Sequence, residues 1–221
     1  MSRPQDPRSG SADDSPPTEG VSRRGFLKGA SIAVAAAGVV SPSAGAKTPG
    51  LVEEVKILGP GPAPLSLTVN GKQSTAKASP FTTLLDFLRN DLDITGAKRV
   101  CDRGACGACT VFMDGKTISA CCTLAVDAAG HDITTVEGLV GEDGKLSDLQ
   151  SAFVECDALQ CGFCTPGMVM SCTALLAKNA KPTRDEVAQG IAGNICRCGT
   201  YENIFEAVAL ASTGQVKERK Q

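Results

Sequence analysis

The stretch CDRGACGAC at residues 101–109 holds three cysteines and two glycines within nine positions. Cys101, Cys106 and Cys109 follow the spacing C-x4-C-x2-C, and Cys121 comes after eleven intervening residues. Glycine adopts backbone angles that other residues avoid, and it lets main-chain N–H groups approach sulfur closely. Four thiols from one tight loop and one later segment form a metal-ligand set, so the loop is expected to wrap around a metal centre.

The spacing distinguishes between the metal centres that cysteine can hold. C-x4-C-x2-C with a remote fourth cysteine matches plant-type [2Fe-2S] ferredoxins, whereas structural zinc ligands typically come as two close-spaced pairs. Covalent c-type haem is excluded because Thr110 and Thr165, not histidine, follow the two C-x2-C pairs. The single histidine, His131, cannot supply the two imidazoles of a Rieske centre. A [2Fe-2S] cluster on the first cysteine set is therefore predicted.

Around this loop the sequence has the pattern of short strands. Alternating apolar residues and the turns Asn70-Gly71 and Asp114-Gly115 predict two hairpins. Thr82 or Thr83 can cap a short helix between the hairpins. The strands are expected over four ranges: 65–69, 73–78, 110–113 and 117–121. Residues 65–138 are thus predicted to form a small α+β domain.

The second half of the chain has helical periodicity instead. Pro166 lies where a first-turn proline belongs, and Thr183 with Glu186 forms a capping box. Helices are expected over four ranges: 146–156, 167–179, 184–193 and 201–212. We predict a four-helix domain over 139–213, with a polar tail at 214–221. A domain this small usually needs a further source of stability besides its hydrophobic core, such as a bound metal.

A second cysteine set lies in this helical half. Its C-x2-C and C-x-C pairs are formed by four residues: Cys161, Cys164, Cys196 and Cys198. Taken alone, this pattern is weaker than the first, and zinc is a fair alternative to iron. Three cysteines remain outside both sets, and Cys122, Cys156 and Cys172 are expected to be buried small hydrophobic residues.

Net charge excludes one class of partner. The 221 residues include 22 Lys and Arg against 24 Asp and Glu, which gives a formal charge of −2. No basic stripe with interleaved aromatic residues is present, although phosphate binding requires one. Nucleic acid is not an expected partner.

The first 46 residues are read as a leader and not as part of the fold. A polar segment is followed by SRRGFLK at 22–28, an apolar run at 30–40 and a small-residue site ending at Ala46. The pair Arg23 and Arg24 resembles the twin-arginine export signal, which serves proteins that fold before export. The apolar run is too short to span a bilayer, so no membrane span is expected.

Several expectations follow from this leader. Cleavage after Ala46 would leave a mature chain that begins with a Pro- and Gly-rich linker at 47–64. The twin-arginine machinery would deliver the protein to the periplasm. Cysteines in that compartment are normally oxidised to disulfides, but thiols that bound iron before export would arrive protected.

Three segments together resemble one known family. The motifs QCGFCTPG at 160–167 and GNICRCG at 193–199 resemble the second-cluster motifs of the molybdenum hydroxylases, the xanthine dehydrogenase and aldehyde oxidoreductase group. Residues 101–109 resemble that family's first-cluster motif, and the similarity runs from about 65 to 211. Together with the leader, the resemblance is greatest to the small iron–sulfur subunits of periplasmic aldehyde oxidoreductases.

The resemblance implies a fold and a role. The fold would be a plant-type ferredoxin-like β-grasp domain followed by an all-α four-helix [2Fe-2S]-binding domain. Electrons would pass singly from a molybdopterin cofactor on a large subunit through the helical-domain cluster, then the first cluster, to FAD on a third subunit. Gln160 and Cys198 would contact the pterin. The complex would oxidise aldehydes to carboxylic acids.

Three alternatives remain open at this point. An isoquinoline- or xanthine-type hydroxylase of N-heteroaromatic compounds would share every motif. A stand-alone ferredoxin-like carrier would need only one cluster domain, and the second domain with Gln160 counts against it. A zinc-binding interaction module is the third alternative.

Overall fold

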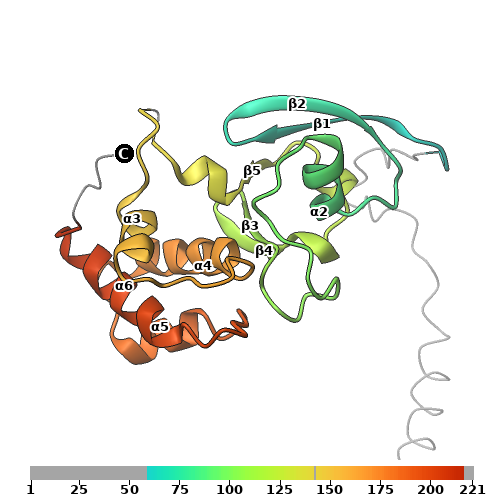
Figure 1. Ribbon diagram of the computed structural model, residues 1–221. Coiled ribbons are helices and arrows are strands. Elements are labelled where there is room, and N and C mark those ends of the chain that lie inside the picture. The colour runs from blue at the N-terminus through green and yellow to red at the C-terminus, as the bar shows by residue number, and fades with distance from the viewer. Residues whose placement is uncertain (1–58, 142, 217–221) are drawn as a thin grey trace, which may run out of the picture. The chain divides into compact units, whose positions relative to one another are not determined.

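The computed structural model describes residues 59–141 and 143–216 of the chain (Figure 1). The predicted leader with Arg23, Arg24 and the cleavage after Ala46 lies outside these residues, as do most of the linker and the last five residues of the tail. In the two described ranges, no helix has both the length and the apolar character to cross a membrane.

The first part of the described chain is built on a mixed sheet, and residues 63–134 are called the sheet domain here. Its strands are β1 (Ala63–Val69), β2 (Lys72–Ala78), β3 (Thr110–Met113), β4 (Lys116–Ser119) and β5 (Asp132–Thr134). They lie in the order β2-β1-β5-β3-β4. Strand β1 pairs antiparallel with β2 and parallel with β5, and β3 pairs antiparallel with β4 and β5.

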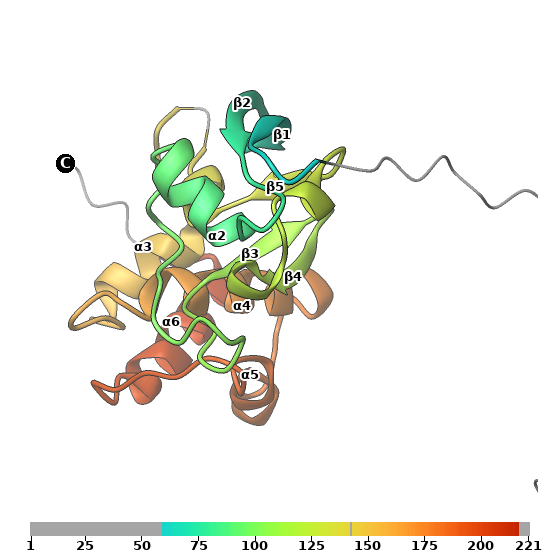
Figure 2. The same ribbon diagram turned by 90° about the vertical axis from the view of Figure 1, so that its right-hand side faces the viewer.

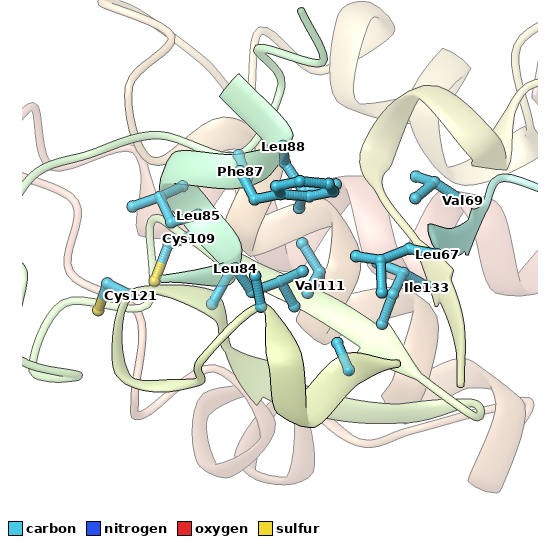
Figure 3. Close-up of a cluster of buried hydrophobic side chains, with 14 of the residues drawn as sticks. Leu67, Val69, Leu84, Leu85, Phe87, Leu88, Cys109, Val111, Cys121 and Ile133 are labelled. Atoms are coloured by element: carbon cyan, nitrogen blue, oxygen red, sulfur yellow. The ribbon is translucent and has the colours of Figure 1, made fainter. Parts of the chain in front are cut away.

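A short helix covers the apolar core of this sheet. Helix α2 (Leu84–Asp86) continues into a π-helical turn at Phe87–Asp91, and the Thr83 hydroxyl caps it by accepting the Asp86 N–H at 3.1 Å. Apolar residues of this segment and of alternate strand positions are buried together, as Figure 3 shows for Leu67, Val111 and their neighbours. The cap and both hairpins confirm the sequence predictions.

Four helices form the second part, and residues 148–213 are called the helical domain here. They are α3 (Asp148–Glu155), α4 (Thr165–Lys178), α5 (Arg184–Gly190) and α6 (Tyr201–Thr213). Pro166 lies in the first turn of α4, and the predicted capping box of Thr183 and Glu186 is present on α5. A second capping box, between Ser147 and Gln150, begins α3. An α+β fold with a separate helical part was therefore predicted correctly.

Some element boundaries differ from the predictions for local reasons. Strand β5 was not predicted, because three residues are too few to show alternation. Strand β4 ends at Ser119, and a 3-10 turn at Ala120–Cys122 follows in place of the expected strand. Helix α5 ends at Gly190 and not at Gly193, because glycine is a weak helix former.

The two domains are in direct contact through α4. This helix lies beside β3 and β4, which both Figure 1 and Figure 2 show from different sides. The connection between the domains is also tied down: the Glu137 carboxylate accepts the Gly96 N–H at 2.6 Å, and the Gln150 amide donates to the Val136 carbonyl at 3.1 Å. The first cysteine loop ends at Cys109, immediately before β3, and the C-x2-C pair ends at Cys164, immediately before α4. The contact between β3 and α4 therefore brings these two motifs near each other.

Candidate metal centres

The loop at 101–109 winds tightly around its own cysteine side chains. Asp102, Gly104 and Gly107 all have positive φ, at 50°, 69° and 69°. This winding turns main-chain N–H groups toward sulfur: Gly104 donates to Cys121 Sγ and Ala105 to Cys101 Sγ, both at 3.3 Å. Such donors stabilise a thiolate and the metal centre that it binds.

The four thiols of the first set interact as two pairs. Cys101 interacts with Cys106, and Cys109 with Cys121. Figure 3 shows the second pair side by side at one end of the apolar core, below α2. Cys106, Cys109 and Cys121 are buried, and Cys101 is half-buried. Three thiols of the set therefore lie inside the protein, and the fourth lies near the solvent.

The pKa values of this set follow hydrogen bonding and burial. The pKa of Cys101 is lowered to about 7, first by the Arg103 N–H and then by the Cys106 thiol. Burial raises the pKa of Cys106, and it raises that of Cys109 to about 12. A thiol must lose its proton to ligate metal, so binding at the buried positions releases protons.

The thiols of the second set also interact as two pairs, and they come from the segments that precede two helices. Cys161 and Cys164 precede α4, and Cys196 and Cys198 precede α6. Cys161 interacts with Cys198, and Cys164 interacts with Cys196. Each pair thus joins the C-x2-C motif to the C-x-C motif.

Hydrogen bonds lower two pKa values in this set as well. Burial works to raise the pKa of Cys196, but the Thr200 hydroxyl, 3.2 Å from the sulfur, and the Thr200 N–H lower it to about 7. The Phe163 N–H lowers the pKa of Cys161, and burial raises that of Cys164 to about 12. In the loop that holds Cys196 and Cys198, the Tyr201 hydroxyl accepts the Cys196 N–H at 2.8 Å.

This arrangement fits a binuclear [2Fe-2S] cluster in each domain. Such a cluster has two irons, and each iron takes two thiolates. Both sets present two pairs of thiols, which matches the ligands that such a cluster needs. Next to Cys164, the buried Thr165 hydroxyl has no hydrogen-bond partner among the described residues, so it is free to donate to a bound group.

Gln160 and Cys198, the residues predicted to contact a pterin, lie at the surface of the helical domain. Gln160 is exposed and Cys198 is half-buried. Gln160 immediately precedes Cys161 in the sequence, and the Cys161 thiol interacts with the Cys198 thiol. Large apolar side chains are exposed around the same set: Leu159 by 41%, Phe163 by 55% and Ile195 by 52%. Apolar side chains that lie next to ligands of the second set in the sequence are therefore accessible at the surface.

The three cysteines outside the sets have different environments. Cys172 is buried in α4 as predicted, and Cys156 is half-buried at the end of α3. The expectation for Cys122 was wrong, because its side chain is exposed. The 3-10 turn at Ala120–Cys122 directs Cys121 into the core and leaves its neighbour outside, with the two sulfurs 3.7 Å apart.

Two residues with clear structural roles at the sites escaped the sequence reasoning. The Asn194 side chain is buried and bonds to the Gly107 carbonyl in the other domain, and the Tyr201 hydroxyl bridges Cys196 N–H and the Asn194 carbonyl. Asn194 lies in the quoted motif GNICRCG, and that position was the available signal. Its hydrogen bonds depend on tertiary contacts that a local pattern does not contain.

Comparison with known families covers both domains. Residues 67–135 match the 2Fe-2S iron-sulfur cluster binding domain, and residues 135–209 match a second family described as the [2Fe-2S] binding domain. Together these matches span most of the described chain. Each contains one of the two cysteine sets.

Individual proteins show the same relationship over longer stretches. The nicotine 6-hydroxylase small subunit of Paenarthrobacter nicotinovorans is 49% identical over 69% of this chain and 90% of its own. The aldehyde oxidoreductase iron-sulfur-binding subunit PaoA of Escherichia coli K12 is 39% identical over 97% of this chain and 96% of its own. Among solved structures, a chain of quinoline 2-oxidoreductase from Pseudomonas putida 86 superposes with a TM-score of 0.66 at 43% identity, covering 70% of this chain and 96% of that one.

Proposed function

The chain belongs to the iron–sulfur subunits of the xanthine dehydrogenase and aldehyde oxidoreductase family of molybdenum hydroxylases; from this premise we propose that it passes electrons from a molybdopterin subunit to a flavin subunit during aldehyde oxidation. The observation that carries the proposal is the pairing of eight thiols into four pairs, two pairs in each of two adjoining domains. Two one-electron carriers suit the outflow of a two-electron oxidation.

The residues of this chain would hold two clusters and tune their surroundings. The ligands would be Cys101, Cys106, Cys109 and Cys121 in the sheet domain, and Cys161, Cys164, Cys196 and Cys198 in the helical domain. When bound, each [2Fe-2S] cluster takes up and releases one electron. N–H donors such as Gly104 and Ala105 stabilise the negative charge that an added electron brings. Burial of three ligands in the first set keeps water away from that site.

The exposed residues next to the ligands of the second set support its position next to the molybdopterin subunit. An exposed amide at Gln160 offers donors and an acceptor to a pterin edge, and the sulfur of Cys198 is partly accessible beside it. Exposed Leu159 and Phe163 add apolar area of the kind that protein interfaces bury. Electrons would enter here and leave through the sheet-domain cluster toward FAD.

Aldehydes are the proposed substrates because PaoA, an aldehyde oxidoreductase subunit, aligns with 97% of this chain. That alignment reaches into the N-terminal region, and the nicotine 6-hydroxylase subunit aligns with only 69%. We also propose that this N-terminal region directs export. The leader with Arg23 and Arg24 would send the complex to the periplasm through the twin-arginine pathway. The higher identity to the nicotine 6-hydroxylase subunit, 49%, favours hydroxylation of an N-heteroaromatic compound as the second candidate.

One purification tests the main proposal. The protein is isolated through a C-terminal tag on this chain, and iron, zinc, molybdenum and flavin are measured in the product. We expect about four iron atoms per chain, two distinct [2Fe-2S] resonance signals on reduction, and co-purifying molybdenum and FAD. Reduction of the clusters by aldehydes, but not by nicotinate or quinoline, would support the aldehyde assignment. Bound zinc without a reducible signal would contradict the electron-transfer role.

A further inference from the structure

One backbone hydrogen bond joins the two ligand loops directly. The Ile195 N–H donates to the Cys106 carbonyl at 3.0 Å. Cys106 belongs to the first set, and Ile195 immediately precedes Cys196 of the second set. From sulfur to sulfur, the connection therefore runs through the covalent bonds of three residues and through a single hydrogen bond.

Asn194 holds this hydrogen bond in place. Its side chain is 5% exposed, its amide donates to the Gly107 carbonyl at 3.1 Å, and its carbonyl oxygen accepts the Ser171 hydroxyl at 2.8 Å. A buried amide whose donor and acceptor are both used has one low-energy orientation. The residues on either side of the Cys106–Ile195 contact are thus fixed to each other and to α4.

Two glycines make the close approach possible. A Cβ atom at Gly107 would lie 2.5 Å from the Asn194 amide nitrogen, and a Cβ at Gly167 would collide with the Gly107 carbonyl. Gly107 belongs to the first cysteine loop, and Gly167 to the first turn of α4 behind Cys164. Any larger side chain at these positions would separate the two ligand loops.

We propose that the Cys106–Ile195 hydrogen bond is the electron path between the two clusters and that Asn194 is the positioning residue that maintains it. This inference rests on the ligand sets of the proposed function. In the step, one electron leaves the helical-domain cluster, which is oxidised, and enters the sheet-domain cluster, which is reduced. No covalent bond breaks and no proton moves.

A matched pair of substitutions at Ile195 isolates the hydrogen bond. Ile195→Pro removes the N–H donor, whereas Ile195→Ala keeps it and shortens the same exposed side chain. The tagged protein is purified with its subunits, and one electron is introduced by flash photoreduction. The redistribution rate between the two resonance signals is then measured, together with both reduction potentials. We expect slower redistribution in Ile195→Pro, wild-type redistribution in Ile195→Ala, and unchanged potentials in both.

Asn194→Ala provides a second variant in case proline disturbs the loop. It leaves the N–H of Ile195 in place but removes the side chain that fixes the loop, so redistribution should again slow while both signals persist. Iron counts separate the possible failures. Zinc or missing signals in the wild-type protein would overturn the proposed function itself. Wild-type redistribution in Asn194→Ala, and in Ile195→Pro wherever it retains both clusters, would overturn this inference and leave the ligand sets standing.

Discussion

Hydrogen bonds and burial together set the pKa values of the thiols in this protein. Cys101 and Cys196 have pKa values lowered to about 7, with the Arg103 N–H the main cause at one and the Thr200 contacts outweighing burial at the other. Cys172, which is buried among apolar side chains, has its pKa raised to about 12. Because the thiolate is the metal ligand, each set contains a thiol whose hydrogen bonds favour the ligating form.

The neighbouring residues Cys121 and Cys122 allow a direct test of the ligand assignment. Cys121→Ser replaces a buried sulfur that pairs with Cys109, so the first cluster should be lost or strongly altered. Cys122→Ser changes an exposed side chain and should leave the cluster intact. Iron content and the sheet-domain resonance signal measure both outcomes. The reverse result, with Cys122→Ser losing the cluster and Cys121→Ser keeping it, would show that the assignment is wrong by one residue.

Gln160 is the residue with which the proposed pterin contact can be examined. Gln160→Ala removes an exposed amide beside Cys161 and touches no ligand, so iron content should stay at the wild-type level. We expect less molybdenum retained per complex, or slower reduction of the clusters by substrate. Gln189→Ala, at another exposed glutamine on α5, is the control and should change neither quantity. Equal molybdenum content and equal reduction rates in the two variants would remove Gln160 from the electron entry.

Among the elements, the ones that could be predicted from sequence are those with local signals. The hairpin of β1 and β2 has alternating side chains and an Asn-Gly turn, and α5 has a complete capping box. Strand β5 has neither signal: its three residues become a strand only because β1 and β3 lie on either side. The turn that separates Cys121 from Cys122 is likewise set by packing, so the exposure of Cys122 could not be predicted.

The cap of α5 carries a prediction about local stability. The Thr183 hydroxyl accepts the Glu186 N–H at 3.3 Å, and the Glu186 carboxylate accepts the Thr183 N–H at 2.7 Å. Thr183→Ala should lower the free energy of local opening of α5 by about 1 kcal/mol, a typical value for an N-cap. Hydrogen exchange of the α5 amides measures this change. Thr183→Ser retains the hydroxyl and should exchange like the wild type; equal exchange in all three proteins would show that the cap contributes nothing.

The first turn of α4 carries a second prediction at this scale. Gly167→Ala places a methyl group against the Gly107 carbonyl, and overpacking of this kind costs about 1–3 kcal/mol. Gly193→Ala is the matched control, since a Cβ there meets nothing within 4 Å. Thermal unfolding of the iron-loaded proteins should show a lower midpoint for Gly167→Ala only. If the control falls as far as the test variant, the loss reflects a general intolerance of alanine in these loops and not the close approach of the domains.

Across the whole molecule, each domain could be predicted from its own motif, but the contact between them could not. Asn194 and Gly107 are 87 residues apart in sequence, and their hydrogen bond depends on how α4 packs beside β3 and β4. Packing of one domain on another is decided by the shapes of many side chains, none of which forms a local pattern. The substrate could not be predicted from this chain's motifs, because this chain would supply cluster ligands and a partner would supply the catalytic pocket.

Export of the complete complex is the prediction at this scale. Replacing both Arg23 and Arg24 with lysine keeps the charge of the leader but removes the guanidinium pair that a twin-arginine receptor would read. We expect iron-loaded complex to accumulate in the cytoplasm, together with any partner subunit that has no leader of its own, because a folded assembly would depend on this single signal. Cell fractionation followed by activity and iron assays of each fraction measures the result. Lysine at both Arg3 and Arg8, which precede the signal, is the matched control and should leave export unchanged. Periplasmic activity at the wild-type level in the Arg23 and Arg24 variant would mean that the complex reaches that compartment by another route, and cytoplasmic activity in the wild type would mean that residues 1–46 are not an export leader.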